Sequence, residues 1–241
     1  MRLIVYIFFI GVLFSCKKNN NRSCFKSNGI TINKTQNINS HSDEITIYDD
    51  INLILINDSL NYINIQGPKN LIDLIEIIQN DNHTSIKNNN KCSFLRKNRD
   101  INVEYHYNSL NLVQLEGYGE LSNSLEINHS ILIKAVNSLS SINLKVYNDS
   151  IKIILQNGST DVKLSGKCNY FYIYDESYAP LKAFNLEADK VHIHSNSISN
   201  AQINVLKDLN AEIRSKGNVY YKGNPSVIKN TSTSSGRLIQ Q

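Results

Sequence analysis

A period of twenty residues runs through the second half of this 241-residue chain. Isoleucine recurs at this interval in five successive units, and a second apolar column lies two positions earlier. Turn-forming residues keep the same interval. The three columns are Ile133, Ile153, Ile173, Ile193 and Ile213; Ile131, Ile151, Phe171, Val191 and Ala211; and Gly117, Asn137, Asn157, Ser177, Ser197 and Gly217. Columns that stay in register over this many units indicate a structural repeat.

Each unit also shows the alternation of apolar and polar residues that is typical of β-strands, as in residues 142–146 and 191–194. A helical repeat needs more residues than this unit contains. The interval fits one coil of a β-solenoid, in which equivalent positions of neighbouring coils stack about 4.8 Å apart. The sequence therefore predicts an all-β solenoid with coils of roughly twenty residues and an inward isoleucine column.

The first half of the chain is less regular. Strand patterns lie at residues 45–47, 51–55, 62–65 and 101–105. A short helix is expected after Asn70, because Leu71, Leu74, Ile75 and Ile78 follow helical spacing. Residues 80–100 are polar and predict a long turn or excursion. This half forms either irregular coils of the same solenoid or a cap, and the regular coils begin at about residue 101.

Composition narrows the class of protein. Hydrophobic residues make up 41% of the chain and charged residues 19%, which permits a real core and disfavours disorder or a multi-pass membrane protein. The net charge of +4 is small and scattered, so no nucleic-acid partner is expected.

The N-terminus has the order of an export signal. Arg2 precedes an apolar run over residues 3–14, which is too short to span a bilayer as a helix. Residues 13–16 resemble the lipobox of bacterial lipoproteins, which predicts a signal peptide over residues 1–15, lipid attachment at Cys16 and a polar tether over residues 16–43. An ordinary secretory signal is the alternative. Position 17 is Lys rather than the Asp of the inner-membrane retention signal, so we expect an outer membrane lipoprotein that faces the periplasm or the cell surface.

Three cysteines remain beyond Cys16. Cys24 and Cys92 are the expected partners if a disulfide forms, and buried or unpaired thiols are the alternative for Cys24, Cys92 and Cys168. None of the three has CxxC spacing, so zinc binding or thiol catalysis by cysteine is not expected.

The end of the chain carries a family resemblance. Residues 215–225 read SKGNVYYKGNP, and SSGRLI follows at residues 234–239. Together with GPKNL at residues 67–71 and the repeated coils, this is similar to the family of putative auto-transporter adhesins with a head GIN domain, over residues 44–241. The resemblance implies a right-handed β-helix, a role in adhesion and no catalytic residues. The turn near Ser177 lacks the glycines of that family, so we expect a different turn geometry there.

If the isoleucines point inward, their neighbours build an outward patch. The expected columns are Leu132, Lys152, Tyr172, His192 and Glu212, and Lys134, Ile154, Tyr174, His194 and Arg214. An exposed tyrosine row flanked by basic side chains suits sugar stacking or protein contact. The candidate binding patch is Tyr170, Tyr172, Tyr174, His192, His194 and Arg214. A partly covered outer face or an oligomer contact is the alternative.

His192 and His194 share one strand face at a spacing that can hold zinc or copper, and Glu212 is expected one coil away. A third ligand is not obvious from the sequence, so we expect no metal and no other cofactor. A β-helix enzyme acting on carbohydrate needs converging carboxylates. The adjacent acids at 49–50 and 175–176 point to opposite faces of a strand, and Asp161 stands alone, so we expect no enzyme.

The sequence therefore predicts an exported, lipid-anchored solenoid that acts as a non-catalytic binding or adhesion module. Its expected partners are the membrane, through the lipid, and a glycan or protein ligand, with a second copy of the chain as a further candidate. A periplasmic structural or signalling scaffold is the alternative function, and a carbohydrate-active enzyme is the least favoured one.

Overall fold

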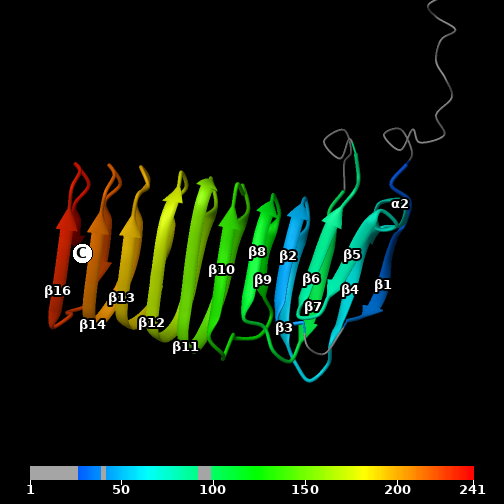
Figure 1. The fold of residues 1–241 in the computed structure, drawn as a ribbon, viewed down its shortest axis with the longest axis horizontal. Coiled ribbons are helices and arrows are strands. Elements are labelled where there is room, and N and C mark those ends of the chain that lie inside the picture. The colour runs from blue at the N-terminus through cyan, green and yellow to red at the C-terminus, as the bar shows by residue number, and fades with distance from the viewer. Residues whose placement is uncertain (1–26, 39–41, 92–98) are drawn as a thin grey trace, which may run out of the picture.

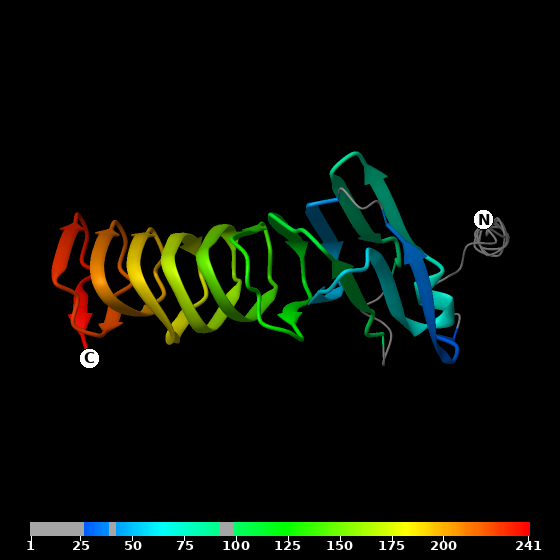
Figure 2. The same cartoon turned by 90° about the horizontal axis from the view of Figure 1, so that it is seen from below.

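The computed structural model describes residues 27–38, 42–91 and 99–241. Within these ranges the chain is nearly all β and winds into a solenoid of about six turns (Figure 1). Figure 2 shows the coils side by side along one axis, with the C-terminus at one end. The predicted β-helix with coils of roughly twenty residues is confirmed.

The regular coils occupy the C-terminal half. The long strands β11 to β14 each bend once, at a corner of the solenoid. One coil therefore consists of the second half of one strand, a turn, and the first half of the next strand. Neighbouring coils pair in parallel. The strands are β10 (Ile131–Val136), β11 (Ser141–Gly158), β12 (Asp161–Ser177), β13 (Leu181–Ser195), β14 (Ala201–Ile213), β15 (Val219–Lys222), β16 (Val227–Ser232) and β17 (Leu238–Gln240).

The inward isoleucine column forms the centre of the core. Ile133, Ile153, Ile173 and Ile193 are ladder partners in successive coils, and all four are fully buried. Val113 extends the column by one coil. Burial of each such side chain stabilises the fold by about 1.5–3 kcal/mol. Stacking of like side chains explains why the column is nearly invariant along the chain.

The strict period fails most clearly between β13 and β14, and smaller register shifts lie between Gln156 and Gly158 and between Lys163 and Ser165. Between β13 and β14 the ladder pairs Ile193 with Ala211 and pairs Ile213 with Ser195. The cause is a pair of register shifts, because the seven steps from Ala183 to Lys190 lie opposite only five steps on β14. Ile213 still points inward. From Lys190 to Ser195, each residue of β13 pairs with the residue eighteen positions later instead of twenty.

The N-terminal coils are stacked in an order that differs from their order in the chain. They consist of β2 (Glu44–Asp49) with β3 (Asn52–Asn57), β6 (His83–Asn88) with β7 (Asn102–Tyr107), and β8 (Leu112–Gly117) with β9 (Glu120–Asn123). The coil of β2 and β3 lies between the other two, since β2 pairs with both β6 and β8 and β3 with both β7 and β9. The first coil in chain order is therefore inserted between two coils that follow it in the sequence.

Antiparallel strands close the N-terminal end, so this half of the chain contains both irregular coils and a cap. β4 (Tyr62–Pro68) pairs with β7 and with β1 (Thr31–Asn37), and β5 (Ile75–Asn80) pairs with β6. These strands correct three expectations. Part of the predicted tether is strand β1. The helix α2 ends at Ile72 (Lys69–Ile72), because the following isoleucines join β5. The predicted excursion contains β6.

The turns follow the expected chemistry. Asn137 and Asn157 adopt positive φ values of 49° and 52°, which asparagine tolerates. Ser177 does not, and it lies opposite Gly158 rather than Asn157, so Asn157 is the extra residue of a bulge. The different geometry predicted near Ser177 is confirmed. Gly117 is required by close stacking, since a Cβ there would lie 2.1 Å from the Asp49 carbonyl oxygen.

Several predictions concern residues outside the described ranges: the signal peptide at 1–15, Cys16, Cys24 and Cys92. Cys168 is described, and it is buried between Asn148 and Ala188 of the neighbouring coils. No helix in the described part of the chain is long and apolar enough to cross a bilayer.

Candidate functional site

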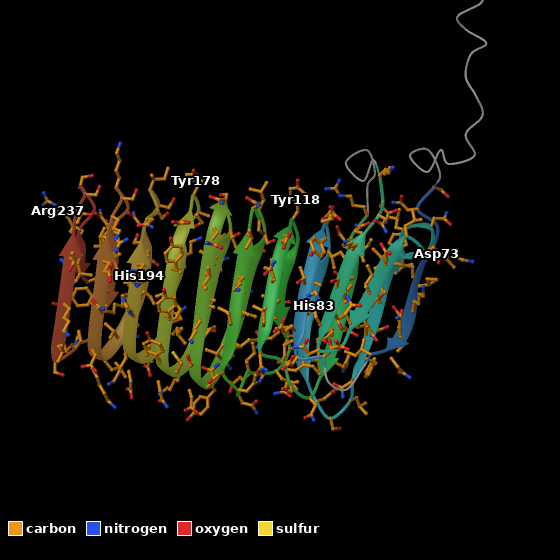
Figure 3. The ribbon with its side chains drawn as sticks, viewed as in Figure 1. Asp73, His83, Tyr118, Tyr178, His194 and Arg237 are labelled. Atoms are coloured by element: carbon orange, nitrogen blue, oxygen red, sulfur yellow. The ribbon has the colours of Figure 1, made fainter. Side chains whose placement is uncertain are left out.

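Two outward columns lie on the face formed by the second halves of β11, β12 and β13. Parallel pairing sets their members as Leu132, Lys152, Tyr172, His192 and Asn210, and as Lys134, Ile154, Tyr174, His194 and Glu212. Figure 3 shows His194 on this face, and it is the second-last residue of β13. The columns alternate with the buried isoleucines, so their backbone positions are held by the core.

The expected columns are therefore correct up to β13 and wrong beyond it. We expected Glu212 beside His192 and Arg214 beside His194. The displacement of β14 puts Asn210 beside His192 and Glu212 beside His194, and Arg214 lies one position further along the face.

His192, His194 and Glu212 form a compact cluster. The Nδ1 atom of His194 lies 3.2 Å from Oε2 of Glu212, and the Nε2 atom of His192 lies 3.6 Å from Oε1. The two imidazole rings are 4.4 Å apart between centroids. Each side chain keeps 20–27% exposure, so the cluster is sheltered but open to solvent.

Arg214 and Asn210 surround this cluster. The Arg214 guanidinium donates a hydrogen bond of 2.8 Å to Oε2 of Glu212, and the Asn210 amide lies 3.1 Å from Nε2 of His192. Partial burial disfavours the Glu212 carboxylate, but the charges and hydrogen bonds of His194, Arg214 and His192 outweigh it and lower the pKa of Glu212. The carboxylate is thus held ionised beside two imidazoles.

Tyr170, Tyr172 and Tyr174 point outward but are half-buried, which corrects the expectation of an exposed row. The Tyr172 ring lies edge-on to His192 at 5.6 Å, and the Tyr174 ring lies 6.2 Å from His194. The Tyr174 hydroxyl donates to Glu176. This bond and burial raise the pKa of Tyr174, and burial raises that of Tyr170. The histidines of the next coil therefore cover part of the tyrosine surface.

The five patch residues Tyr172, Tyr174, His192, His194 and Arg214 thus lie together, joined by ring contacts, ion pairs and hydrogen bonds.

A model of the family described as "Putative auto-transporter adhesin, head GIN domain" matches residues 41–225, which is well over half of the chain. The chain belongs to the head GIN domain family. This finding confirms the resemblance carried by the final coil. No curated protein matches the chain.

Solved structures show the same fold. A putative adhesin from Bacteroides fragilis is 18% identical and has a TM-score of 0.80, over 88% of this chain and 97% of its own. A putative lipid binding protein from Parabacteroides distasonis is also 18% identical, with a TM-score of 0.61 over 89% and 98%. A putative adhesin from Parabacteroides merdae is 18% identical, with a TM-score of 0.58 over 88% of this chain and 98% of its own. At this identity the likeness concerns the fold alone.

The acids that we considered for catalysis are engaged separately in this head GIN domain. Asp175 points into the core and is buried, whereas Glu176 faces outward. Asp161 pairs with Lys182 at 3.1 Å, and Asp50 pairs with Arg99 at 3.2 Å. These acids do not converge on one another.

The head GIN domain also has a polar groove that we did not predict. It encloses 610 Å³ at the corner where the coils turn from one face to the next. Asp149, Asn169 and Asp189 line it at the twenty-residue interval, and Tyr147 contributes an exposed ring. The twenty-residue interval between these polar residues is visible in the sequence. It does not by itself predict a groove, because polar residues recur in the same way at ordinary solvent-exposed turns.

A second feature that we did not predict is an apolar ridge, which we define as Tyr118, Leu139, Tyr178 and Ile198. Each is 57–64% exposed and lies at a turn between two successive strands, away from the corner of the polar groove. Tyr118 and Tyr178 lie along one row of turns in Figure 3. The turn column of the sequence lies one or two residues before these positions.

Proposed function

We propose that this head GIN domain is an exported, lipid-anchored and non-catalytic binding module of the cell envelope, whose role is adhesion to a glycan. The family match and the adhesin-like relatives support an exported or surface-associated protein. The sequence of residues 1–16 supports attachment through a lipid on Cys16. Several acyl chains would give stable anchoring, since each buried methylene contributes about 0.8 kcal/mol.

The observation that carries the proposal is the arrangement of Tyr172 and Tyr174 on the outer face. Their rings rest against His192 and His194, so little rotamer freedom remains to be lost on binding. Aromatic rings with polar tips suit the apolar faces and hydroxyls of sugars. Lys152 and Lys190 are exposed beside Tyr172 and Tyr170 in the ladder and supply hydrogen-bond donors.

The test is a glycan array probed with the wild-type chain, with Tyr172→Ala and with Tyr178→Ala. Tyr178 is an exposed tyrosine at a turn of the neighbouring face, so it controls for loss of one aromatic ring. We expect Tyr172→Ala to lose at least tenfold in glycan affinity and Tyr178→Ala to behave as wild type. Equal binding by all three proteins, or no glycan binding by wild type, would contradict the proposal.

A second candidate function is a periplasmic structural or signalling scaffold, and the apolar ridge favours it. Four large apolar side chains lie at exposed turns along one edge, interrupted only at the coil of Gly158 and Ser159, and they fit a protein partner better than a sugar. Protease treatment of intact cells, with lysed cells as control, separates the two functions. Digestion of the anchored protein on intact cells supports adhesion. Protection until lysis rules adhesion out and favours a periplasmic partner.

A further inference from the structure

We propose that His192, His194 and Glu212 form a binding site for one zinc ion. The sequence predicted no metal, because no third ligand was evident beside the two histidines. Glu212 was expected beside His192 alone, and the displacement of β14 makes it the ladder partner of His194 while its carboxylate stays 3.6 Å from His192. The proposal does not depend on glycan binding by the tyrosines.

The distances between the donor atoms are close to those of a zinc site. Zinc bonds of 2.0–2.1 Å in a tetrahedron place neighbouring ligand atoms about 3.3 Å apart. Here His192 Nε2 lies 3.6 Å from Oε1 of Glu212, and His194 Nδ1 lies 3.2 Å from the other oxygen of the same carboxylate, Oε2. One donor atom from each residue lies within 4.8 Å of the others. Small side-chain rotations would bring all three to one ion.

The backbone already holds the three side chains on one face. His192 and His194 are two residues apart on β13, so they point the same way, and Glu212 is the ladder partner of His194 on β14. Ile193 and Ile213, which are fully buried, fix the strands at this point. The site would therefore form with little ordering of the chain.

The chemistry of the donors selects the class of metal. Two imidazoles and one carboxylate suit zinc and similar transition metals, whereas calcium and magnesium prefer oxygen ligands alone. Three protein ligands leave one position for water or for a ligand atom. The partial exposure of the cluster gives an ion access from solvent.

Neighbouring groups are placed to support bound zinc. Arg214 donates to Oε2 of Glu212, which leaves Oε1 free for the metal, and ligating carboxylates are commonly held by such bonds. The Asn210 amide lies 3.1 Å from Nε2 of His192 and must turn away when this nitrogen takes the metal. Arg214 is 57% exposed, so its guanidinium can also move to reduce repulsion.

The test is calorimetric titration of the full chain, without a polyhistidine tag, with zinc chloride. We expect His192→Ala, His194→Ala and Glu212→Gln each to weaken zinc binding at least tenfold. The control His83→Ala removes an imidazole from β6, in the N-terminal half, and should leave the affinity unchanged. Because cysteines outside the described residues could also hold zinc, the comparison between variants decides the assignment.

Two results would overturn the site: no heat of zinc binding to wild type at millimolar metal, or wild-type affinity in the double variant His192→Ala/His194→Ala. Circular dichroism without metal checks that each variant is folded. If an alanine variant unfolds, His192→Gln and His194→Gln replace it. Cobalt is a second probe, since the visible spectrum of four-coordinate cobalt should appear in wild type and disappear in His194→Gln. Repeating the glycan array with a chelator shows whether the two proposals fail separately.

Discussion

His194 lies beside Glu212 in the parallel ladder, with 3.2 Å between Nδ1 and Oε2. The two residues are eighteen positions apart, whereas most coil partners in this solenoid are twenty apart. A missing pair of residues at one corner therefore brings a carboxylate to two imidazoles. Had the period continued unchanged, Arg214 would lie beside His194, and Glu212 would lie beside His192 instead of beside His194.

The isoleucine column is expected to dominate stability. Ile173→Ala removes a fully buried side chain between Ile153 and Ile193 and should reduce the free energy of unfolding by about 2–5 kcal/mol. Urea unfolding followed by circular dichroism measures this loss. Lys152→Ala, on the outer face of the neighbouring coil, should change stability by less than about 0.5 kcal/mol. Similar losses for both variants would show that the column is not the main core.

Asp175 is expected to make stability depend on pH. Burial raises the pKa of this carboxyl to about 6, against its hydrogen bonds to Ser177. The folded protein then holds the proton more tightly than the unfolded chain, so stability falls as pH rises from about 4 to about 6. Asp175→Asn removes this dependence. Its stability relative to wild type should increase by up to about 3 kcal/mol between pH 4 and pH 8.

Thermal melts of both proteins at these two pH values test the prediction. The stability difference between Asp175→Asn and wild type is compared at the two pH values. Any effect of the new amide that does not depend on pH cancels in this comparison. A difference that does not change with pH would contradict an inward, protonated carboxyl at low pH.

Gly117→Ala is expected to destabilise the fold through backbone overlap. The added Cβ would lie 2.1 Å from the Asp49 carbonyl oxygen and 2.5 Å from its amide nitrogen. Backbone atoms cannot yield as a side chain does, so we expect a loss of about 2–4 kcal/mol in a urea melt. Ser159→Ala, at an exposed turn two coils away, is the control. Wild-type stability of Gly117→Ala would mean that β2 and β8 are less closely stacked.

Cys168 is expected to be unreactive in the folded protein. Burial, with a smaller contribution from Asp189, raises the pKa of its thiol to about 12, so almost no thiolate exists at pH 8. Iodoacetamide should leave Cys168 unmodified until urea unfolds the chain. Mass spectrometry of the peptide that contains Cys168 measures this without interference from the other cysteines. Rapid modification in native buffer would place Cys168 at the surface.

The regular coils could be predicted because their residues report the structure directly. Ile153 and Ile173 are both neighbours in space and equivalent in sequence, so the stacking appears as a period. The order of β2, β6 and β8 could not be predicted in this way. A period records which positions are equivalent, and it does not record which coil lies beside which once the chain order and the spatial order differ.

The site was predictable in part for the same reason. Tyr172 and His192 were correctly expected to be neighbours, since no register shift separates their halves of β12 and β13. Glu212 and Arg214 were misplaced because the bulges between Ala183 and Lys190 leave no simple sequence pattern. The alternation of residues predicts that the tyrosines point outward. It does not predict their half-burial, which depends on how the histidine rings of the next coil pack against them.

The inserted coil of β2 and β3 has a consequence for how the protein is made. A chain that emerges N-terminus first, from a ribosome or across a membrane, presents these strands before β6 to β9 exist. Until residue 123 has emerged, their edges stay open to pairing with other chains. From β10 onward each new coil adds to a finished one. We therefore expect biogenesis in two phases, with the strand edges of the early phase more open to aggregation.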